Sequence, residues 1–159
     1  MNIIIDPNKQ KLFLYNDDQL LLSYDVSTSR SGLGEKEGSF KTPRGLHEVC
    51  EKIGHGAMIN SVFVGRRLTG EIYSAILAAK EPNRDWILTR ILRLSGLEPG
   101  KNQGGNVDTL KRMIYIHGTP ESEPMDQPLS HGCIRMRNKD IIELFDLVLT
   151  GTKVLIHPG

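Results

Sequence analysis

Short apolar runs separated by turn residues fill the first third of the chain and predict β-structure. Asn16-Asp17-Asp18 is a polar turn between two such runs, so the flanking strands are expected to form a hairpin. The predicted strands are Asn2–Ile5, Lys11–Tyr15, Gln19–Ser27, Leu46–Glu51, Ser61–Gly65, Met113–His117 and Thr152–His157.

Three segments have helical spacing of their apolar residues. Glu71–Lys80 ends before Pro82, and Asp85–Ser95 has Asp85 as a candidate cap and Gly96 where a helix commonly ends. A third helix is predicted from Asn138, as its cap, through Thr150. The pattern predicts one domain over residues 1–159, mainly β with inserted helices packed at its edges as a β-rich sandwich, and not a regular βαβ winding.

Composition is ordinary for a globular protein, with 38% hydrophobic and 25% charged residues. The formal net charge of +1 and the 6% aromatic content do not favour a nucleic-acid partner. The N-terminus, MNIIIDPNKQKLFLY, lacks the features of a signal peptide, and no window is apolar enough for a membrane span. The sequence therefore predicts a cytoplasmic protein without a membrane partner, and it leaves the oligomeric state open.

Two cysteines, Cys50 and Cys133, do not form a disulfide framework. Cys50 is interpreted as a packed small residue or an incidental free thiol. A Cys50–Cys133 disulfide remains an alternative.

The stretch Ile116–Arg137 carries the candidate chemistry, because two His-Gly pairs precede and adjoin Cys133. A cysteine attacks as a thiolate and needs a nearby base. His117 ends a predicted strand, which makes it the better general base, whereas His131 is the better local organiser. Gly132 permits an unusual turn between His131 and Cys133.

Backbone N–H groups around Gly132 and Cys133 can converge as an oxyanion hole for acyl transfer. Arg135 and Arg137 would point to the same side as Cys133 in an extended segment, where an arginine can hold a substrate carboxylate. Two alternatives stay open on spacing alone. One is a metal site with added ligands from His47, Cys50 or His55, although paired zinc spacings are absent, and the other is a core histidine beside an inert thiol.

The segments Tyr115-Ile116-His117-Gly118-Thr119 and Ser130-His131-Gly132-Cys133-Ile134-Arg135-Met136 resemble the signature of the L,D-transpeptidase catalytic domain, also called the YkuD domain. Thr42-Pro43-Arg44-Gly45 resembles the upstream Thr-Pro-x-Gly element of that family. The resemblance covers nearly the whole chain and implies the β-rich sandwich of that family.

The resemblance implies roles for individual residues. Cys133 matches the nucleophile, His117 the general base, and Gly118 the residue whose carbonyl orients the imidazole. His131, Gly132 and Cys133 match the oxyanion-hole segment, and Arg135 a position that carries Asn or Arg. Ser130 and Tyr115 are further expected to contact substrate. No cofactor and no metal are expected.

Family enzymes cleave the bond between a diamino acid, usually meso-diaminopimelate, and D-alanine in a peptidoglycan tetrapeptide. Transfer to an amine gives 3–3 cross-links or D-amino-acid exchange, whereas transfer to water is L,D-carboxypeptidase activity. Because no leader was found, the prediction is an L,D-carboxypeptidase that trims muropeptides in wall recycling. The alternatives are an L,D-transpeptidase and an inactive muropeptide-binding domain. A Trp86–Leu97 helix and the Gly100–Asp108 loop are candidates for a lid, or simply pack on the sandwich.

Overall fold

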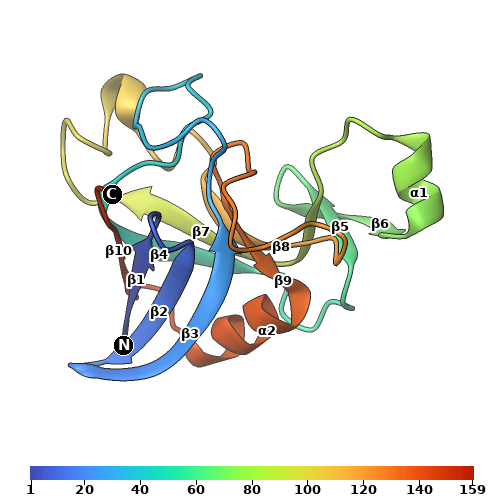
Figure 1. Cartoon of the computed structure of the whole chain (residues 1–159), viewed down its shortest axis with the longest axis horizontal. Coiled ribbons are helices and arrows are strands. Elements are labelled where there is room, and N and C mark those ends of the chain that lie inside the picture. The colour runs from blue at the N-terminus through green and yellow to red at the C-terminus, as the bar shows by residue number, and fades with distance from the viewer.

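A single coiled β-sheet forms the body of the protein in the computed structural model, which describes all 159 residues (Figure 1). Its strand order is β4-β10-β1-β2-β3-β9-β8-β7-β5-β6, and an additional β4–β7 pairing closes eight of the ten strands into a ring. The result is a barrel-like sandwich from which the β5–β6 hairpin extends. The strands are β1 Asn2–Asp6, β2 Lys11–Asn16, β3 Gln19–Ser27, β4 Gly45–Ile53, β5 Ser61–Val64, β6 Arg67–Ile72, β7 Ile87–Gly96, β8 Tyr115–Thr119, β9 Ile134–Arg137 and β10 Lys153–Ile156.

The main core lies inside this ring. Every second residue of a strand points into this core. Examples are Ile3 and Ile5 of β1 and Leu12 and Leu14 of β2, all 0% exposed. Helix α2, Asn138–Leu147, adds one apolar stripe to the same cluster of 19 buried residues. Each fully buried side chain of this size contributes about 1.5–3 kcal/mol, so the ring and α2 stabilise one another.

Strands β8 and β9 run parallel, side by side, with His117 opposite Arg135 in the register. The segment between them, residues 120–133, brings the chain back to the same end of the sheet. Residues 115, 117 and 119 share one face of β8, away from Ile116 in the main core. The topology therefore places the His-Gly pair of β8 next to the segment that carries Cys133.

The predicted helix Asp85–Ser95 is wrong, because Ile87–Gly96 is the long central strand β7. This strand pairs with β4, β5 and β8, and both of its faces are covered. Leu92 belongs to the main core and Ile91 to a second cluster on the other face. A strand buried on both faces has apolar residues at consecutive positions, and here they coincided with helical spacing.

The other two helices are shorter than predicted. Helix α1 is Ala75–Lys80, capped by Ser74, and residues 67–72 before it form the unpredicted strand β6. Helix α2 begins after Arg137 and ends at Leu147, so Asn138 is not its cap. The Asn138 side chain is instead 0% exposed and accepts a hydrogen bond from Thr89 Oγ1 (2.6 Å).

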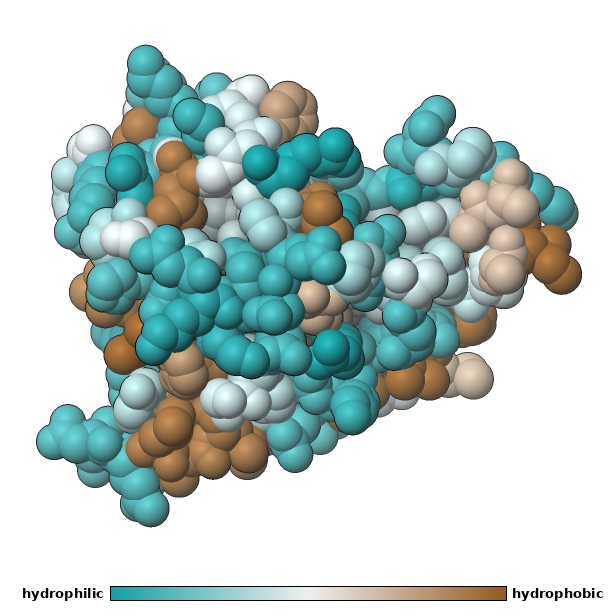
Figure 2. Space-filling model, in the orientation of Figure 1, coloured by the Kyte–Doolittle hydropathy of each residue, from teal (hydrophilic) through white to brown (hydrophobic).

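An arm formed by β5, β6 and α1 projects from the ring (Figure 1). Helix α1 has no buried residue, and Ile76 is 73% exposed. Figure 2 shows hydrophobic residues gathered at the end of this arm, beside a mostly hydrophilic face. None of the helices has the length and apolar content needed to cross a membrane.

Candidate active site

His117 is fixed in the middle of β8 and is 1% exposed. Its Nδ1 lies 2.6 Å from the Gly118 carbonyl oxygen. Because a carbonyl only accepts, Nδ1 carries the proton and Nε2 is left with its lone pair. Burial lowers the pKa of the imidazole, against the opposing effects of the Gly118 carbonyl and Asp85. His117 is therefore a neutral imidazole with a basic Nε2 at neutral pH.

Gly118 is required by the close approach of neighbouring atoms. A Cβ at this position would meet the Asn138 Oδ1 and would lie 2.6 Å from the Leu88 carbonyl oxygen. Thr89 lies beneath it in a bulge of β7, with a φ of 76°. The bulge, Asn138 and Gly118 together set the position of the carbonyl that orients His117.

Cys133 immediately precedes β9 and is half-buried. Its Sγ donates to the Met113 carbonyl oxygen (3.4 Å) and accepts from the Tyr115 N–H (3.3 Å). Removal from water raises the pKa of the thiol to about 12, an effect that the Tyr115 N–H opposes and Asp85 reinforces. The resting site thus holds a neutral thiol and a neutral imidazole, and no hydrogen bond joins Cys133 to His117.

The loop before Cys133 is held by hydroxyl groups. Ser130 is 1% exposed, and its Oγ donates to the Cys133 carbonyl oxygen (2.5 Å) and accepts from the Gly132 N–H (3.2 Å). Thr42 Oγ1 donates to the Gly132 carbonyl oxygen (2.9 Å). Gly132 has a φ of 129°, which side chains rarely tolerate. The N–H groups of His131 and Cys133 have no protein acceptor and are the backbone donors that remain for an oxyanion.

A charged cleft of about 440 Å³ opens beside this loop. Arg135 is 8% exposed, and its guanidinium contacts Asp85 Oδ1 (3.2 Å) and Glu123 Oε2 (3.5 Å). His131 lies between Asp85 Oδ2 (3.5 Å from Nδ1) and Arg30 Nη2 (3.3 Å from Nε2). Cationic and anionic side chains therefore line the cleft in pairs. Such a lining suits a ligand that carries both a positive and a negative group.

A smaller cleft of about 230 Å³ lies next to the segment that precedes Cys133, since His131 lines it. Met113, whose carbonyl accepts from Cys133 Sγ, lines it together with Phe40 and Arg112. His131 lines both clefts. Both clefts therefore reach the loop that carries Cys133 through His131.

The structure brings Cys133, Tyr115 and the His117-Gly118 pair together but gives several predicted residues different surroundings. Tyr115 is 3% exposed and forms a cluster with Phe63 and Ile91, against which Cys133 packs, and its backbone N–H donates to the thiol. The Ser130 hydroxyl forms its hydrogen bonds within the loop, to the Cys133 carbonyl oxygen and the Gly132 N–H. Arg137 pairs with Asp25 (3.2 Å) on β3.

The remaining thiol and histidines do not join this site. Cys50 is free, as is Cys133, so the alternative of a disulfide is wrong. His47 is 0% exposed and contacts the Gly45 carbonyl and Thr109 Oγ1, each at 3.0 Å. No group of three His, Cys, Asp or Glu side chains is arranged to hold a metal ion.

Sequence reasoning missed four residues that shape the site: Thr42, Asp85, Arg112 and Glu123. Asp85 was interpreted as a helix cap, and Thr42 only as part of a family element. Arg112 donates to three oxygens of the 34–41 segment, including the Lys41 carbonyl (2.6 Å). Only the three-dimensional arrangement shows that Thr42 contacts Gly132, that Asp85 and Glu123 contact Arg135, and that Arg112 holds the segment before Thr42.

A thiol that follows a strained glycine, next to a strand paired with the one that carries a histidine of fixed tautomer, is an arrangement that suits cysteine-dependent acyl transfer. A family model, the L,D-transpeptidase catalytic domain (YkuD), matches residues 2–156. The chain belongs to this family of cysteine-dependent enzymes.

Curated relatives match over shorter segments. The chain is 43% identical over 60 residues to the Bacillus subtilis protein "Putative L,D-transpeptidase YkuD", a match that covers 37% of each chain. It is 46% identical over 43 residues to the Escherichia coli protein "Probable L,D-transpeptidase YbiS", which covers 27% of this chain and 14% of that protein. The matched segments thus span a little over a third or less of these relatives.

Solved structures share the fold. An L,D-transpeptidase from Mycobacterium smegmatis superposes with a TM-score of 0.60 at 18% identity, covering 98% of this chain and 57% of that one. L,D-transpeptidase 3 from Mycobacterium tuberculosis, in complex with a faropenem-derived adduct, gives 0.59 at 16% identity, covering 98% and 59%. These likenesses show the β-rich sandwich, as the sequence predicted.

Proposed function

We propose that this protein cleaves the bond between a diamino acid and D-alanine in peptidoglycan tetrapeptides, with Cys133 as nucleophile and His117 as general base. The observation that carries this proposal is the His117–Gly118 contact of 2.6 Å, which leaves Nε2 free to accept a proton near the segment that carries Cys133. A wrong tautomer would present an N–H to the thiol instead.

The chemistry begins from two neutral groups. Cys133 turns from the Met113 carbonyl toward His117, and the thiol proton moves to Nε2 as sulfur bonds to the carbonyl carbon. When the tetrahedral intermediate collapses, the C–N bond breaks and the imidazolium gives that proton to the leaving amine of D-alanine. The products are free D-alanine and a thioester on Cys133.

Charge on the intermediate would be stabilised by the backbone. The free N–H groups of His131 and Cys133 flank Gly132, whose own N–H is already bound by Ser130. Gly132 would therefore supply the conformation and not a donor. One oxyanion donor is typically worth about 3–4 kcal/mol of transition-state stabilisation.

The charged cleft supports a diamino acid at the acyl side of the cleaved bond. The second stereocentre of diaminopimelate carries an ammonium and a carboxylate. Asp85 and Glu123 provide acceptors for the former, and Arg30 and Arg135 provide donors for the latter. Binding would exchange ion pairs within the protein for ion pairs with the substrate, which favours specificity over affinity.

For the second step, water is proposed as the main acceptor, making the protein an L,D-carboxypeptidase. His117 would take a proton from water, hydroxide would attack the thioester, and Cys133 would leave with that proton. The cleft of about 230 Å³ is smaller than the roughly 300–1,000 Å³ of ordinary small-molecule sites, so it suits water or one amino acid better than a second stem peptide.

Because this cleft suits one amino acid, exchange of D-amino acids is the second candidate function, and cross-linking transpeptidation stays an alternative on the family match alone. A role in muropeptide recycling and a cytoplasmic location stay predictions, which cell fractionation can test. An inactive binding domain is disfavoured by the presence of both Cys133 and His117.

Incubation with a disaccharide tetrapeptide separates these functions. Loss of one alanine without dimers supports hydrolysis, whereas dimers, or incorporation of an added D-amino acid, support transfer. His117→Ala should fold but turn over far more slowly, and a normal rate would move the base role to another residue. Arg135→Lys keeps the charge but loses the planar fork, and should raise KM for this substrate.

A further inference from the structure

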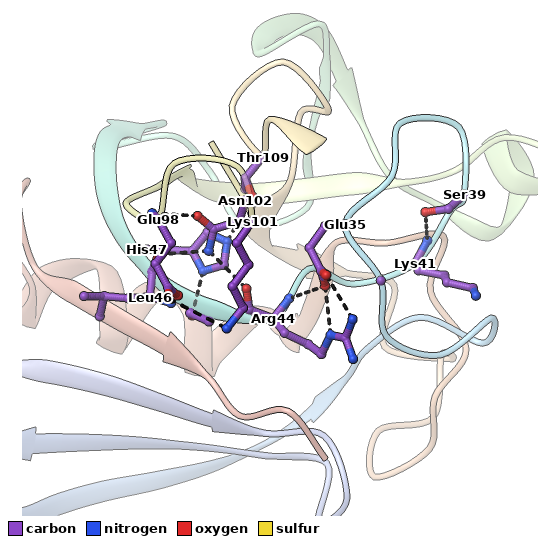
Figure 3. Close-up of polar contacts among 12 residues, drawn as sticks. Glu35, Ser39, Lys41, Arg44, Leu46, His47, Glu98, Lys101, Asn102 and Thr109 are labelled. Atoms are coloured by element: carbon purple, nitrogen blue, oxygen red, sulfur yellow. Dashed lines mark hydrogen bonds and ion pairs between the residues drawn. The ribbon is translucent and has the colours of Figure 1, made fainter. Parts of the chain in front are cut away.

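A third cleft, of about 480 Å³, lies between the segment 33–44 and the loop 98–107. Four cationic side chains line it, Lys36, Lys41, Arg44 and Lys101, together with Glu35 and Ser39. Most of these side chains are drawn in Figure 3. None of them lines the two clefts beside Cys133.

The charges of this cleft do not cancel. Arg44 directs Nε and Nη2 at the two oxygens of Glu35, both at 2.9 Å, so this pair is neutral overall. Burial acts to raise the pKa of Glu35, but the hydrogen bonds from Arg44 outweigh it and hold the pKa below its ordinary value. Lys101 has a loose partner in Glu98 at 3.7 Å. Lys36 and Lys41 form no ion pair, which leaves two uncompensated ammonium groups.

The walls of the cleft are fixed before any ligand arrives. Asn102 is 0% exposed, accepts from the Glu98 N–H (2.9 Å), and donates to the carbonyls of Arg44 (3.0 Å) and Leu46 (3.1 Å). The Glu37 N–H donates to the Asn106 carbonyl (2.7 Å) and ties the two walls together. The Gly100–Asp108 loop, for which a lid and simple packing were both considered, is thus bound to β4 through Asn102 (Figure 3). A preformed site loses little entropy on binding.

This cleft is also joined to the catalytic loop. The Lys41 carbonyl accepts from Arg112 (2.6 Å), and the next residue, Thr42, holds the Gly132 carbonyl. The stem of Lys41 packs over Gly34, where a Cβ would lie 2.7 Å from Lys41 Cδ. An occupant bound by Lys41 would therefore lie one residue from the support of the Cys133 loop.

We propose that this third cleft binds a phosphate or diphosphate group carried by a substrate or an effector. The only guanidinium in the cleft is that of Arg44, and its Nε–Nη2 edge is already bonded to Glu35, which compensates its charge. The free donors are lysine ammonium groups and the Ser39 hydroxyl, and lysine binds phosphate as a point charge. Together these features favour phosphate over a carboxylate of the stem peptide.

Titration with inorganic pyrophosphate tests the site directly, by calorimetry and by backbone amide shifts of residues 34–44 and 100–107. The double variant Lys36→Gln, Lys41→Gln should bind about tenfold more weakly, because two nearby charges are lost. Lys80→Gln, on the exposed end of α1, removes one charge elsewhere and should bind as the parent does. No binding, equal binding by the double variant, or equally tight binding of glutarate would overturn the proposal.

A second arm, which rests on the proposed function, identifies the carrier of the phosphate. We expect kcat/KM to be higher for a muramyl tetrapeptide bearing a diphosphate than for the same peptide without it, and the double variant to lose this preference. Equal values, with a rate that free pyrophosphate alters, would support a separate effector. If pyrophosphate binds, but the two peptides have equal kcat/KM values and free pyrophosphate does not alter the rate, the proposed role of this cleft in the reaction is wrong. If no tetrapeptide loses alanine while binding depends on the lysines, the proposed function fails and the site stands.

Discussion

Thr42 Oγ1 lies 2.9 Å from the Gly132 carbonyl oxygen, although the two residues are 90 positions apart in the chain. The same Oγ1 accepts a hydrogen bond from the Ser29 N–H (3.0 Å), and Thr42 is 0% exposed. One hydroxyl thus connects the Thr-Pro-x-Gly element to the loop that carries Cys133. Through this contact, a segment without candidate catalytic groups holds the loop that carries the proposed nucleophile.

Thr42→Val should lower kcat about tenfold and destabilise the fold by about 1–3 kcal/mol, because a buried acceptor and a buried N–H lose their partner. Steady-state kinetics and urea unfolding measure the two effects. Thr42→Ser keeps the hydroxyl and serves as the control. Equal loss of activity in both variants would contradict this role of the hydrogen bond, because Thr42→Ser keeps the hydroxyl.

Gly118→Ala should be among the more damaging single changes. The new Cβ would meet Asn138 and lie 2.6 Å from the Leu88 carbonyl, both fixed, so we expect a loss of about 2–3 kcal/mol. Gly34→Ala meets only the flexible Lys41 side chain and should change stability by less than about 0.5 kcal/mol. The free energies of unfolding of the two variants test this difference, and similar values would contradict it.

Alkylation of Cys133 by iodoacetamide should be slow at neutral pH and should keep rising to pH 10. The reason is that burial raises the pKa of the thiol to about 12, so little thiolate exists at pH 7. Mass spectrometry of the Cys133 peptide gives the rate at each pH. A plateau that begins below pH 6 would reveal a resting thiolate–imidazolium pair and would contradict the neutral pair described above.

Stability should fall as the pH drops from about 6.5 to 4, in part because of His47. Burial lowers the pKa of His47 from 6.5 to about 4, so in this range the unfolded chain binds a proton that the folded protein does not. The full effect is about 3 kcal/mol, since each pH unit between the two values contributes about 1.4 kcal/mol. Urea unfolding at pH 7 and pH 4.5 measures it. His47→Gln should show a smaller difference between the two pH values, and an unchanged difference would contradict this assignment.

The strands of the first third and the closing strand were predictable because each buries one face, which gives period two. β7 was not, because it is covered on both sides and its consecutive apolar residues fit a helix as well. Strand β9 was missed because only Ile134–Arg137 forms it, and its pairing with β8 and β3 is non-local. Strand pairings across many residues leave no local signal.

For the site, short spacing within one segment made Cys133, His117 and Gly118 recognisable. The carboxylates that surround Arg135 come from Asp85 and Glu123, on two other segments, and a sequence does not show which charges meet. The same holds for Ser130, whose hydroxyl could only be assigned to the loop once its burial and its partners were known.

The proposed reaction passes through a covalent intermediate on Cys133. Intact-protein mass spectrometry after rapid mixing with a disaccharide tetrapeptide should show an adduct equal to the substrate minus alanine. The adduct should map to Cys133 and be absent from Cys133→Ala, which should also release no alanine. Full alanine release by Cys133→Ala would contradict the account.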